Sequence, residues 1–565
     1  MFWSPAQTRR ASPLDLLALL VLGLLVLVVF LDMPHVFPGP EVRLDLSLRL
    51  LPLYGLFSLA RMVAAYIVSV GFAFVAGYYA ATSPLARRFI LPGLDILQSV
   101  PILGFFPAAV FFFIYLFRGS VLGVEAAAVF LIFTSQAWNL AFSVYESLIT
   151  IPEDLATAVR TSGARGIVRW RRLLLPACVP RLTYNSMLSW AAGWYFLIAS
   201  EMITVGPRSY TLPGLGSYIG QTTADGVYGP AAAGISALTA IIILLHILVW
   251  SPLEYWSKRF RYEYASRTEA GPPPLALTLI QRAPLVRRVW MRALTVSARG
   301  AGAVTARVSA SLTGIHARYL LGSLGLAAVI VIVYGGLGAA AQIFRPLAPE
   351  ARQIPLALAS SFLRLLAAYV ISLAWTIPLA FWLSLSARRS ARVLPVVQVL
   401  ASMPATAFFP VIVALVLALH LDLNVASVAL VLTGMQWYLL FNLVAGAQAM
   451  PEDLRELAAA SNVHGWLYLR RFFLPVAAPS LITGSLTGWG GGWNALIISE
   501  YLTVHGKVYS VNGIGSLLDR ATYVKGDLQM ITLTIVSMVI VISLINRLVW
   551  RRLYQRATER YRLEY

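Results

Sequence analysis

The sequence contains very little charge and almost no cysteine. Only 12% of its 565 residues are charged, about half the usual share for a soluble protein, whereas 59% are hydrophobic and the mean hydropathy is +0.75. A chain this apolar cannot bury its hydrophobic surface in one aqueous core, which excludes a soluble enzyme. The single cysteine, Cys178, cannot form an internal disulfide, so a disulfide-stabilised secreted domain is excluded as well.

The sequence also lacks the short motifs that carry common chemistries. It contains no GxxxxGK[ST] phosphate-binding loop and no GxSxG, HExxH or CxxC pattern, and its six histidines have no metal-ligand spacing. Its three lysines are Lys258, Lys507 and Lys525, and none lies in a phosphate-binding context. We therefore expect no catalytic residue, no metal site and no cofactor bound by this chain.

Long apolar segments account for the composition. The formal net charge of +20 would suggest nucleic-acid binding in a soluble protein. Here the arginines lie in short loops, so we attribute the charge to membrane topology and expect no nucleic-acid partner.

A membrane-spanning helix needs about 20 mostly apolar residues. The predicted spans are 14–31, 54–81, 89–117, 121–143, 179–204, 229–250, 319–341, 361–385, 394–419, 425–447, 478–504 and 528–549.

The arginines also predict which side of the membrane each loop faces. With the amino terminus inside, the arginine pairs at 87–88, 171–172 and 470–471 all fall on the cytoplasmic side. The residues after Leu31 lack a signal-peptidase site, so the first span is expected to be retained. The prediction is an all-α, multi-pass membrane protein of about twelve helices with both termini cytoplasmic.

The chain is an internal duplication. PEDL at 152–155 recurs at 451–454, and WAAGWYFLIASEMITV from Trp190 recurs as WGGGWNALIISEYLTV from Trp489, both at an offset of 299 residues. Earlier in each copy, SLARMVAAY from Ser58 matches SFLRLLAAY from Ser361. We therefore divide the chain into repeat one (1–250) and repeat two (319–565), each with about six spans in parallel orientation. The seam between such repeats is where a transport pathway is expected.

Segment 251–318 joins the repeats. It breaks at three consecutive prolines, 272–274, and then carries six arginines among apolar residues between Arg282 and Arg307. A basic amphipathic segment of this kind suits the surface of an anionic cytoplasmic leaflet, so membrane lipids are its expected partner. The alternative is a plain solvated linker, which would also be cytoplasmic.

A polar, helix-forming segment separates the fourth and fifth spans of each repeat. It reads PEDLATAVRTSGARGIVRWRRLLLP at 152–176 and PEDLRELAAASNVHGWLYLRRFFLP at 451–475. Its first carboxylates favour the start of a helix, and Gly163 or Asn462, which tolerate a left-handed backbone, predict a turn before a second short helix. Because the segment recurs at one register, a docking surface is favoured over a hairpin without a partner.

These segments resemble the cytoplasmic signature of permease subunits from type I binding-protein-dependent ABC importers. The signature is Glu-Ala-Ala, three residues, Gly, and a run ending in Leu-Pro. It falls on Thr157, Ala158, Val159, Gly163 and Pro176 in repeat one, and on Glu456, Leu457, Ala458, Asn462 and Pro475 in repeat two. The resemblance implies that each segment seats in a groove of an ATPase subunit, with Glu153, Asp154, Glu452 and Asp453 at the start of its helix. Thr157 and Asn462 depart from the signature, so the two docking surfaces are expected to differ.

A finer resemblance is to the branch of these permeases that imports nitrate, sulfonates, taurine and bicarbonate. It rests on the prolines of the third span, Pro101 and Pro107, and on Trp194 followed by Ser200-Glu201-Met202, which repeat two matches with Trp493 and Ser499-Glu500. It implies a bacterial inner-membrane protein that works with two cytoplasmic ABC ATPases, which hold ATP and Mg, and with an extracytoplasmic solute-binding protein.

Polar residues within the predicted spans are the candidates for the translocation pathway. They are Gln98, Ser99, Pro101, Trp194, Glu201, Gln398, Ser402, Pro404, Trp493, Asn494 and Glu500. Proline kinks free backbone carbonyls that need polar partners, and ionisable residues within a span usually face an interior or cavity. Two interpretations stay open for Glu201 and Glu500: a site for a cation or proton, or caps for backbone amides of the outer loops.

The sequence therefore predicts the fused transmembrane subunit of an ABC importer for a small oxyanion or sulfonate. Import of ferric iron or another small solute is the alternative within the same superfamily. A twelve-span secondary transporter or a passive channel is less favoured, because neither has a use for two docking segments.

Overall fold

The computed structural model describes residues 44–260, 344 and 346–560, apart from short gaps at 100–101, 118–119, 165, 206–207, 404, 449, 505–506 and 526. The predicted first and seventh spans, most of the segment 251–318, and Pro101 and Pro404 lie outside the described residues. Helix continues past the predicted end of repeat one, as far as Phe260.

The two repeats follow one plan, except that α8 and α9 of repeat one correspond to the single helix α22 of repeat two, that η4 occurs in repeat one alone among the described residues, and that η7 occurs in repeat two alone among them. Repeat one contains η1 (Leu48–Leu50), α2 (Leu51–Thr82), α3 (Pro84–Ser99), α4 (Ile102–Leu116), α5 (Val121–Ile149), α6 (Glu153–Thr161), α7 (Gly166–Arg169), η2 (Trp170–Leu174), α8 (Leu175–Tyr195), α9 (Leu197–Glu201), β1 (Met202–Val205), β2 (Arg208–Thr211), α10 (Leu215–Ala224), α11 (Tyr228–Leu245), η3 (His246–Trp250), α12 (Ser251–Ser257) and η4 (Lys258–Phe260). Repeat two contains η5 (Pro349–Gln353), α16 (Ile354–Ser384), α17 (Ala387–Ser402), α18 (Ala405–Ala418), α19 (Leu423–Gln448), α20 (Glu452–Ala460), α21 (Gly465–Tyr468), η6 (Leu469–Phe473), α22 (Leu474–Glu500), β3 (Tyr501–Val504), β4 (Lys507–Ser510), α23 (Ile514–Asp519), η7 (Arg520–Lys525), α24 (Leu528–Ile545), η8 (Asn546–Trp550) and α25 (Arg551–Arg560). Apart from two short antiparallel hairpins, β1–β2 and β3–β4, the described segments with regular structure are helical, which confirms the all-α class and the two-repeat architecture.

Six described helical stretches are long and apolar enough to cross a membrane. They are Leu48–Thr82, Val121–Ile149, Tyr228–Ser257, Pro349–Ser384, Leu423–Gln448 and Gln529–Ala557. The predicted third span of repeat two is instead two short helices, because α17 ends before Met403, which has an extended backbone, and α18 begins at Ala405. In repeat one, α3 and α4 lie on either side of residues 100–101, which are outside the described residues. Because two predicted spans lie outside the described residues, the count of twelve stays a prediction.

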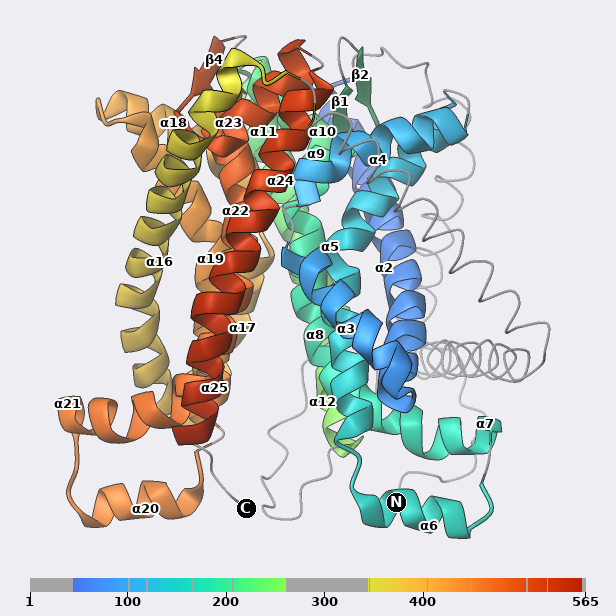
Figure 1. The fold of residues 1–565 in the computed structure, drawn as a ribbon, viewed down its shortest axis with the longest axis vertical. Helices are drawn as coiled ribbons and strands as arrows, with labels where there is room; N and C mark the ends of the chain where they lie inside the picture. Colours follow the sequence, from blue (N-terminus) through green and yellow to red (C-terminus); the bar gives the residue numbers. More distant parts are fainter. Residues whose placement is uncertain are drawn as a thin grey trace.

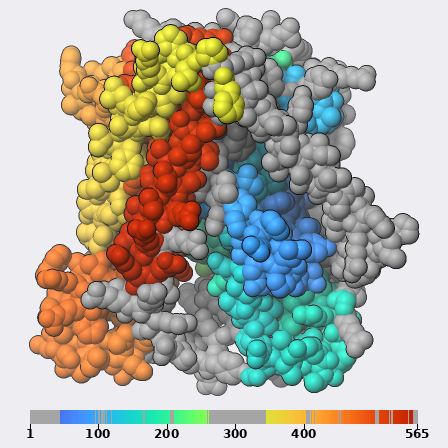
Figure 2. Space-filling model, viewed as in Figure 1, coloured from blue at the N-terminus to red at the C-terminus, as the bar shows by residue number. Residues whose placement is uncertain are grey.

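The repeats stand as two columns with a common orientation (Figure 1). Helices α2, α5 and α8 form one column, and α16, α19 and α22 form the other. The short helices α6, α7, α20 and α21 project at one end of both columns, while the β-hairpins lie at the opposite end. In the space-filling view the projections of the two repeats are separate from each other, teal in repeat one and orange in repeat two (Figure 2).

Packing within the columns also repeats. Tyr66, Trp190 and Trp250 form an aromatic triad with ring centroids 5.3 to 6.2 Å apart. The matching triad in repeat two is Tyr369, Trp489 and Trp550, with centroids 5.7 to 5.8 Å apart. Small residues allow the helices to approach closely: a Cβ added to Gly491 of α22 would lie 2.5 Å from the carbonyl oxygen of Gly434 in α19.

Candidate functional site

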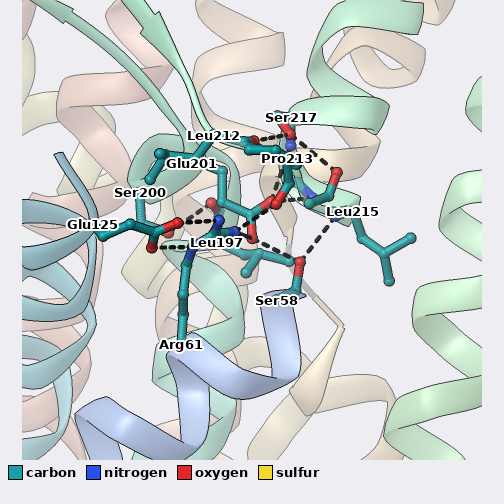
Figure 3. Close-up of polar contacts among 12 residues, drawn as sticks. Ser58, Arg61, Glu125, Leu197, Ser200, Glu201, Leu212, Pro213, Leu215 and Ser217 are labelled. Carbon is teal, nitrogen blue, oxygen red and sulfur yellow. Dashed lines mark hydrogen bonds and ion pairs between the residues drawn. The ribbon is translucent and has the colours of Figure 1, made fainter. Parts of the chain in front are cut away.

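A buried ion-pair cluster joins α2 to the end of repeat one that carries the β1–β2 hairpin (Figure 3). Glu201 is fully buried, and its Oε1 accepts hydrogen bonds from Ser58 Oγ at 2.6 Å and Arg61 Nη1 at 2.8 Å. Its Oε2 accepts from the backbone N–H groups of Gly216 at 2.7 Å and Ser217 at 3.2 Å. These two amides lie in the first turn of α10, where backbone N–H groups have no partner within the helix. The carboxylate therefore caps α10 and ties it to α2.

Arg61 is shared between two carboxylates. Its Nε and Nη2 each donate at 2.7 Å to the two oxygens of Glu125 in α5, a bidentate pair, while its Nη1 bonds Glu201. Nη1 also donates to the carbonyl oxygen of Pro213 at 2.8 Å. One buried guanidinium thus links α2, α5 and the loop before α10.

Repeat two contains the same cluster with one change. Glu500, also fully buried, accepts hydrogen bonds from Ser361 Oγ at 2.6 Å, from Arg364, and from the backbone N–H of Gly515 at 2.8 Å. Arg364 Nε donates at 2.7 Å to Asn424 Oδ1, and Asn424 is the residue aligned with Glu125. Among the described residues, Arg364 is therefore paired with one carboxylate where Arg61 is paired with two.

A further carboxylate orients that asparagine. Asp422 Oδ1 accepts hydrogen bonds from the backbone N–H of Asn424 at 2.7 Å and from its side-chain amide at 2.6 Å. These bonds hold the pKa of Asp422 below its usual value. Asn424 consequently presents its carbonyl oxygen, rather than its NH₂ group, to Arg364.

Sequence reasoning pointed to Glu201 and Glu500 but missed their partners. The available signal was the match between SLARMVAAY and SFLRLLAAY, which keeps a serine and an arginine at one register of an apolar span. A basic residue in such a span normally pairs with a carboxylate inside the protein. The observed geometry favours the capping interpretation of both glutamates.

At the seam between the repeats, the third span of each repeat contacts the fifth span of the other: α4 contacts α22, and α18 contacts α8. The backbone N–H of Ile102, at the start of α4, donates to Asn494 Oδ1 in α22 at 2.6 Å. On the other side, Thr406 Oγ1 of α18 donates to the carbonyl oxygen of Tyr195 in α8 at 3.2 Å. Tyr195 and Asn494 occupy aligned positions in the two repeats. The two sides of the seam therefore have a hydrogen bond at the same position but use different groups to make it.

The structure brings some pathway candidates to this seam. Trp194 and Gln398 line one small cavity between the repeats. Gln98 is half-buried, and its backbone carbonyl oxygen would lie 3.7 Å from a Cβ added to Gly490 of α22. Trp493 is almost fully buried within repeat two. Ser99 and Ser402 are the last residues of α3 and α17.

The docking segments have the expected helix–turn–helix form. Gly163 has φ +71° and Asn462 has φ +51°, each directly after the short helix α6 or α20. Only glycine and, less readily, asparagine adopt this left-handed conformation at low cost, which explains why Asn462 can replace glycine. Pro152 and Pro451 are the residues that directly precede α6 and α20.

Most of the candidate docking residues lie on the surface. Glu153, Asp154, Thr157, Ala158, Gly163, Asp453, Glu456 and Asn462 are exposed, whereas Ala458 is buried and Pro176 and Pro475 are half-buried in the first turns of α8 and α22. Glu452 is the first residue of α20. The two surfaces differ: Thr157 Oγ1 accepts a hydrogen bond from Arg160 Nη2 at 2.8 Å, whereas the aligned Glu456 presents a carboxylate. Repeat two also exposes Trp466 on α21 to 73%.

Two segments, 70–251 and 356–558, each match the family model described as binding-protein-dependent transport system inner membrane component. Together they cover more than half of the chain. The chain belongs to this family. The resemblance predicted from the docking segments is confirmed, and the protein is a multi-pass membrane permease subunit of an ABC importer. Membership of this family implies partnership with an ATPase and a solute-binding protein.

Similar proteins include nitrate and taurine permeases. A probable ABC transporter permease protein of Brucella melitensis is 26% identical over 174 residues, which is 30% of this chain and 67% of that protein. The nitrate import permease protein NrtB of Leptolyngbya laminosa is 27% identical over 192 residues, or 34% and 64%. The taurine transport system permease protein TauC of Escherichia coli is 26% identical over 195 residues, also 34% and 64%. The chain thus spans about two thirds of the length of these relatives.

Proposed function

We propose that this protein forms the whole membrane pathway of an importer for a small oxyanion or sulfonate, in a bacterial inner membrane with both termini cytoplasmic. The supporting observation is the pair of docking segments, which have the same left-handed turns and project at the same end of both repeats. One chain with two docking segments accommodates two ATPase subunits. The similarity to permeases named for nitrate and taurine supports the solute class.

The geometry favours an anion over ferric iron or another cation. A cation site needs carboxylate oxygens with free lone pairs aimed at the ion. Glu201 instead accepts four hydrogen bonds, and Glu500 is held by a serine, an arginine and a backbone amide. These carboxylates hold the outer ends of the repeats together rather than offering ligands to a solute.

Each structural part has a role in the proposed cycle. ATP-driven closure of the two ATPases would bring the docking segments together, and the continuous helical paths from η2 into α8 and from η6 into α22 would carry that movement to the seam. The hairpins β1–β2 and β3–β4 lie at the opposite end, where a binding protein would deliver its solute. Because the buried clusters tie α10 to α2 and α23 to α16, these outer elements would move with the helical columns.

The test is transport by the reconstituted complex. The permease, its ATPase subunits and its binding protein are placed in proteoliposomes, and uptake of nitrate, bicarbonate, taurine and ferric iron is measured with and without ATP. ATP-dependent uptake of one of the anions is the expected result. Uptake of ferric iron alone would refute the proposed solute class, and uptake that needs no ATPase would favour a secondary transporter.

A further inference from the structure

The fifth span is continuous in repeat two and broken in repeat one. In repeat two, α22 runs without interruption over 27 residues. In repeat one, α8 ends at Tyr195 and α9 begins at Leu197. The N–H of Phe196, which lies between them, donates to the carbonyl oxygen of Gly193, only three residues earlier, at 3.2 Å. This is the spacing of a 3₁₀ turn, which often marks a hinge when it lies within a helix.

The break lies where repeat one meets repeat two. Tyr195 is the last residue of α8, and the last four carbonyl groups of a helix have no partner within it. Its carbonyl oxygen accepts the hydrogen bond from Thr406 Oγ1 of repeat two. The aligned Asn494 lies inside α22 and reaches Ile102 with its side chain instead. The seam contact on the first side therefore uses a carbonyl that a continuous helix would give to the N–H four residues later.

The break divides the fifth span of repeat one into a part joined to the docking segment and a part tied to α2. On one side, α8 continues directly from η2, at the end of docking segment 152–176. On the other side, α9 ends at Glu201, whose carboxylate is bonded to Ser58 and Arg61 of α2. In repeat two, the helix that follows η6 reaches the aligned Glu500 without a break. A movement of the docking segment therefore reaches the outer end undivided in repeat two, whereas in repeat one it meets the break.

The packing of the fifth span on the fourth span also differs between the repeats. In repeat one, Asn139 Nδ2 of α5 donates to Ser189 Oγ of α8 at 2.9 Å and to the carbonyl oxygen of Asn185 at 3.3 Å. Asn185 is aligned with Gly484 of α22, where an added Cβ would lie 2.9 Å from the carbonyl oxygen of Tyr438 in α19. Close backbone contact therefore locks α22 on α19, whereas α8 is held on α5 by side-chain hydrogen bonds that can be remade in a second arrangement.

A buried amide beside the break has no partner. Gln136 of α5 is 0% exposed, and neither its Oε1 nor its Nε2 has a hydrogen-bond partner among the described residues. Its Nε2 would lie 2.7 Å from a Cβ added to Gly193, so the amide packs against the turn that precedes Phe196. A buried polar group without a partner raises the free energy of the conformation that contains it. The aligned residue of repeat two is Met435, which has no such need.

We propose that Phe196 is a joint at which the fifth span of repeat one bends during transport, and that Gln136 is a positioning residue that favours a second arrangement of α8, in which its amide bonds the backbone of the turn 193–196. Movement of docking segment 152–176 turns α8 about Phe196 while α9 stays with α2. Movement of docking segment 451–475 passes along α22 as along one rod. The proposal rests on the proposed import function and adds that the two repeats move unequally.

Distances between pairs of spin labels test which repeat bends. In repeat one, the labels are attached at Arg172→Cys, directly before α8, and at Ala224→Cys, at the end of α10. In repeat two, they are attached at Arg471→Cys, directly before α22, and at Arg520→Cys, directly after α23. All four positions are exposed, and the native Cys178 is buried, so it should stay unlabelled.

The labels are read in the lipid-reconstituted complex with its ATPase subunits and binding protein, without nucleotide and trapped with ATP and vanadate. Trapping should shift the distance distribution of the pair in repeat one by several ångströms. The pair in repeat two should stay within about 2 Å, the size of a small helix shift. Equal shifts in the two repeats, a shift in repeat two alone, or no shift in either during ATP-driven uptake would overturn the joint while leaving the import function intact.

Gln136→Met tests the positioning residue, because it removes the unpaired amide and keeps the volume of the side chain. The shifted population in repeat one should fall about tenfold, the effect of one unpaired polar group, and anion uptake should fall with it. Met435→Leu, the matched change in repeat two, should leave both distributions and uptake unchanged. Phe196→Ala introduces the residue that continuous α22 has at this position, so it should reproduce the fall and keeps the test valid if Gln136→Met does not fold.

The label distances separate this role from a packing role. If Gln136 served packing alone, Gln136→Met would change the melting temperature and leave the shifted population as it was, which would overturn the positioning role. An unchanged population in Phe196→Ala as well would overturn the joint. Uptake of ferric iron alone would refute the proposed solute class, but a shift confined to repeat one would still support the joint.

Discussion

Replacing Glu500 by glutamine should destabilise the protein more than replacing Glu201 by glutamine. Both carboxylates are fully buried and accept hydrogen bonds from a serine, an arginine and backbone amides. Either substitution removes a charge and turns an NH₂ group toward a donor. The difference lies in what remains: Arg61 keeps its bidentate pair with the Glu125 carboxylate, whereas the partners that Arg364 keeps among the described residues, the Asn424 side chain and the backbone carbonyl of Asn512, are neutral.

The expected difference is about 2 kcal/mol in the free energy of unfolding. Loss of one charge-assisted hydrogen bond from a guanidinium that stays paired costs about 1.5–3 kcal/mol. A buried charge left without its counter-ion costs about 3–5 kcal/mol. Transport of the same solute should persist in the fraction of either variant that is folded, because both glutamates act as caps rather than as ligands.

The assay combines denaturation of the purified protein with uptake normalised to folded protein. The controls exchange the one residue that differs between the two clusters, Glu125 in repeat one and Asn424 in repeat two. Adding Asn424→Glu should recover much of the stability lost in Glu500→Gln. Adding Glu125→Asn should make Glu201→Gln as destabilising as Glu500→Gln. Equal losses in the two single variants, or no recovery by Asn424→Glu, would refute the charge argument. Unchanged stability with abolished uptake would show instead that the glutamates bind a transported cation or proton.

Three further predictions follow from the backbone and the docking surfaces. Gly163→Val should stop ATP-driven uptake while the protein stays inserted, because valine at φ +71° is strained by about 1–3 kcal/mol; normal uptake in vesicles would contradict this. Gly513→Ala should lower the melting temperature, since its Cβ would overlap the Glu500 carboxylate, whereas Gly229→Ala, with nothing within 4 Å, should not. Glu456→Ala should reduce ATPase stimulation more than Thr157→Ala, and equal effects in that measurement would argue against unequal docking surfaces.

Several features were predictable because they depend on residues close together in the chain. A run of apolar residues defines a membrane-spanning helix locally, and a proline within such a run predicts a kink. The docking turn was predictable for the same reason, since the left-handed preference of Gly163 and Asn462 is a property of single residues. The duplication gave independent support, because each local pattern occurs twice at one register.

The buried clusters and the seam depended on contacts between distant residues. Arg61 and Glu201 are 140 positions apart, and Ile102 and Asn494 are 392 apart, so no local pattern indicates either pair. The sequence by itself determined the membrane class, the two repeats and the docking turns, because hydropathy and backbone preference act along the chain. Only the tertiary structure decided that Glu201 and Glu500 cap helices and that Trp190 and Gln398 share a cavity, because hydrogen bonding and cavity shape depend on how the columns pack against each other.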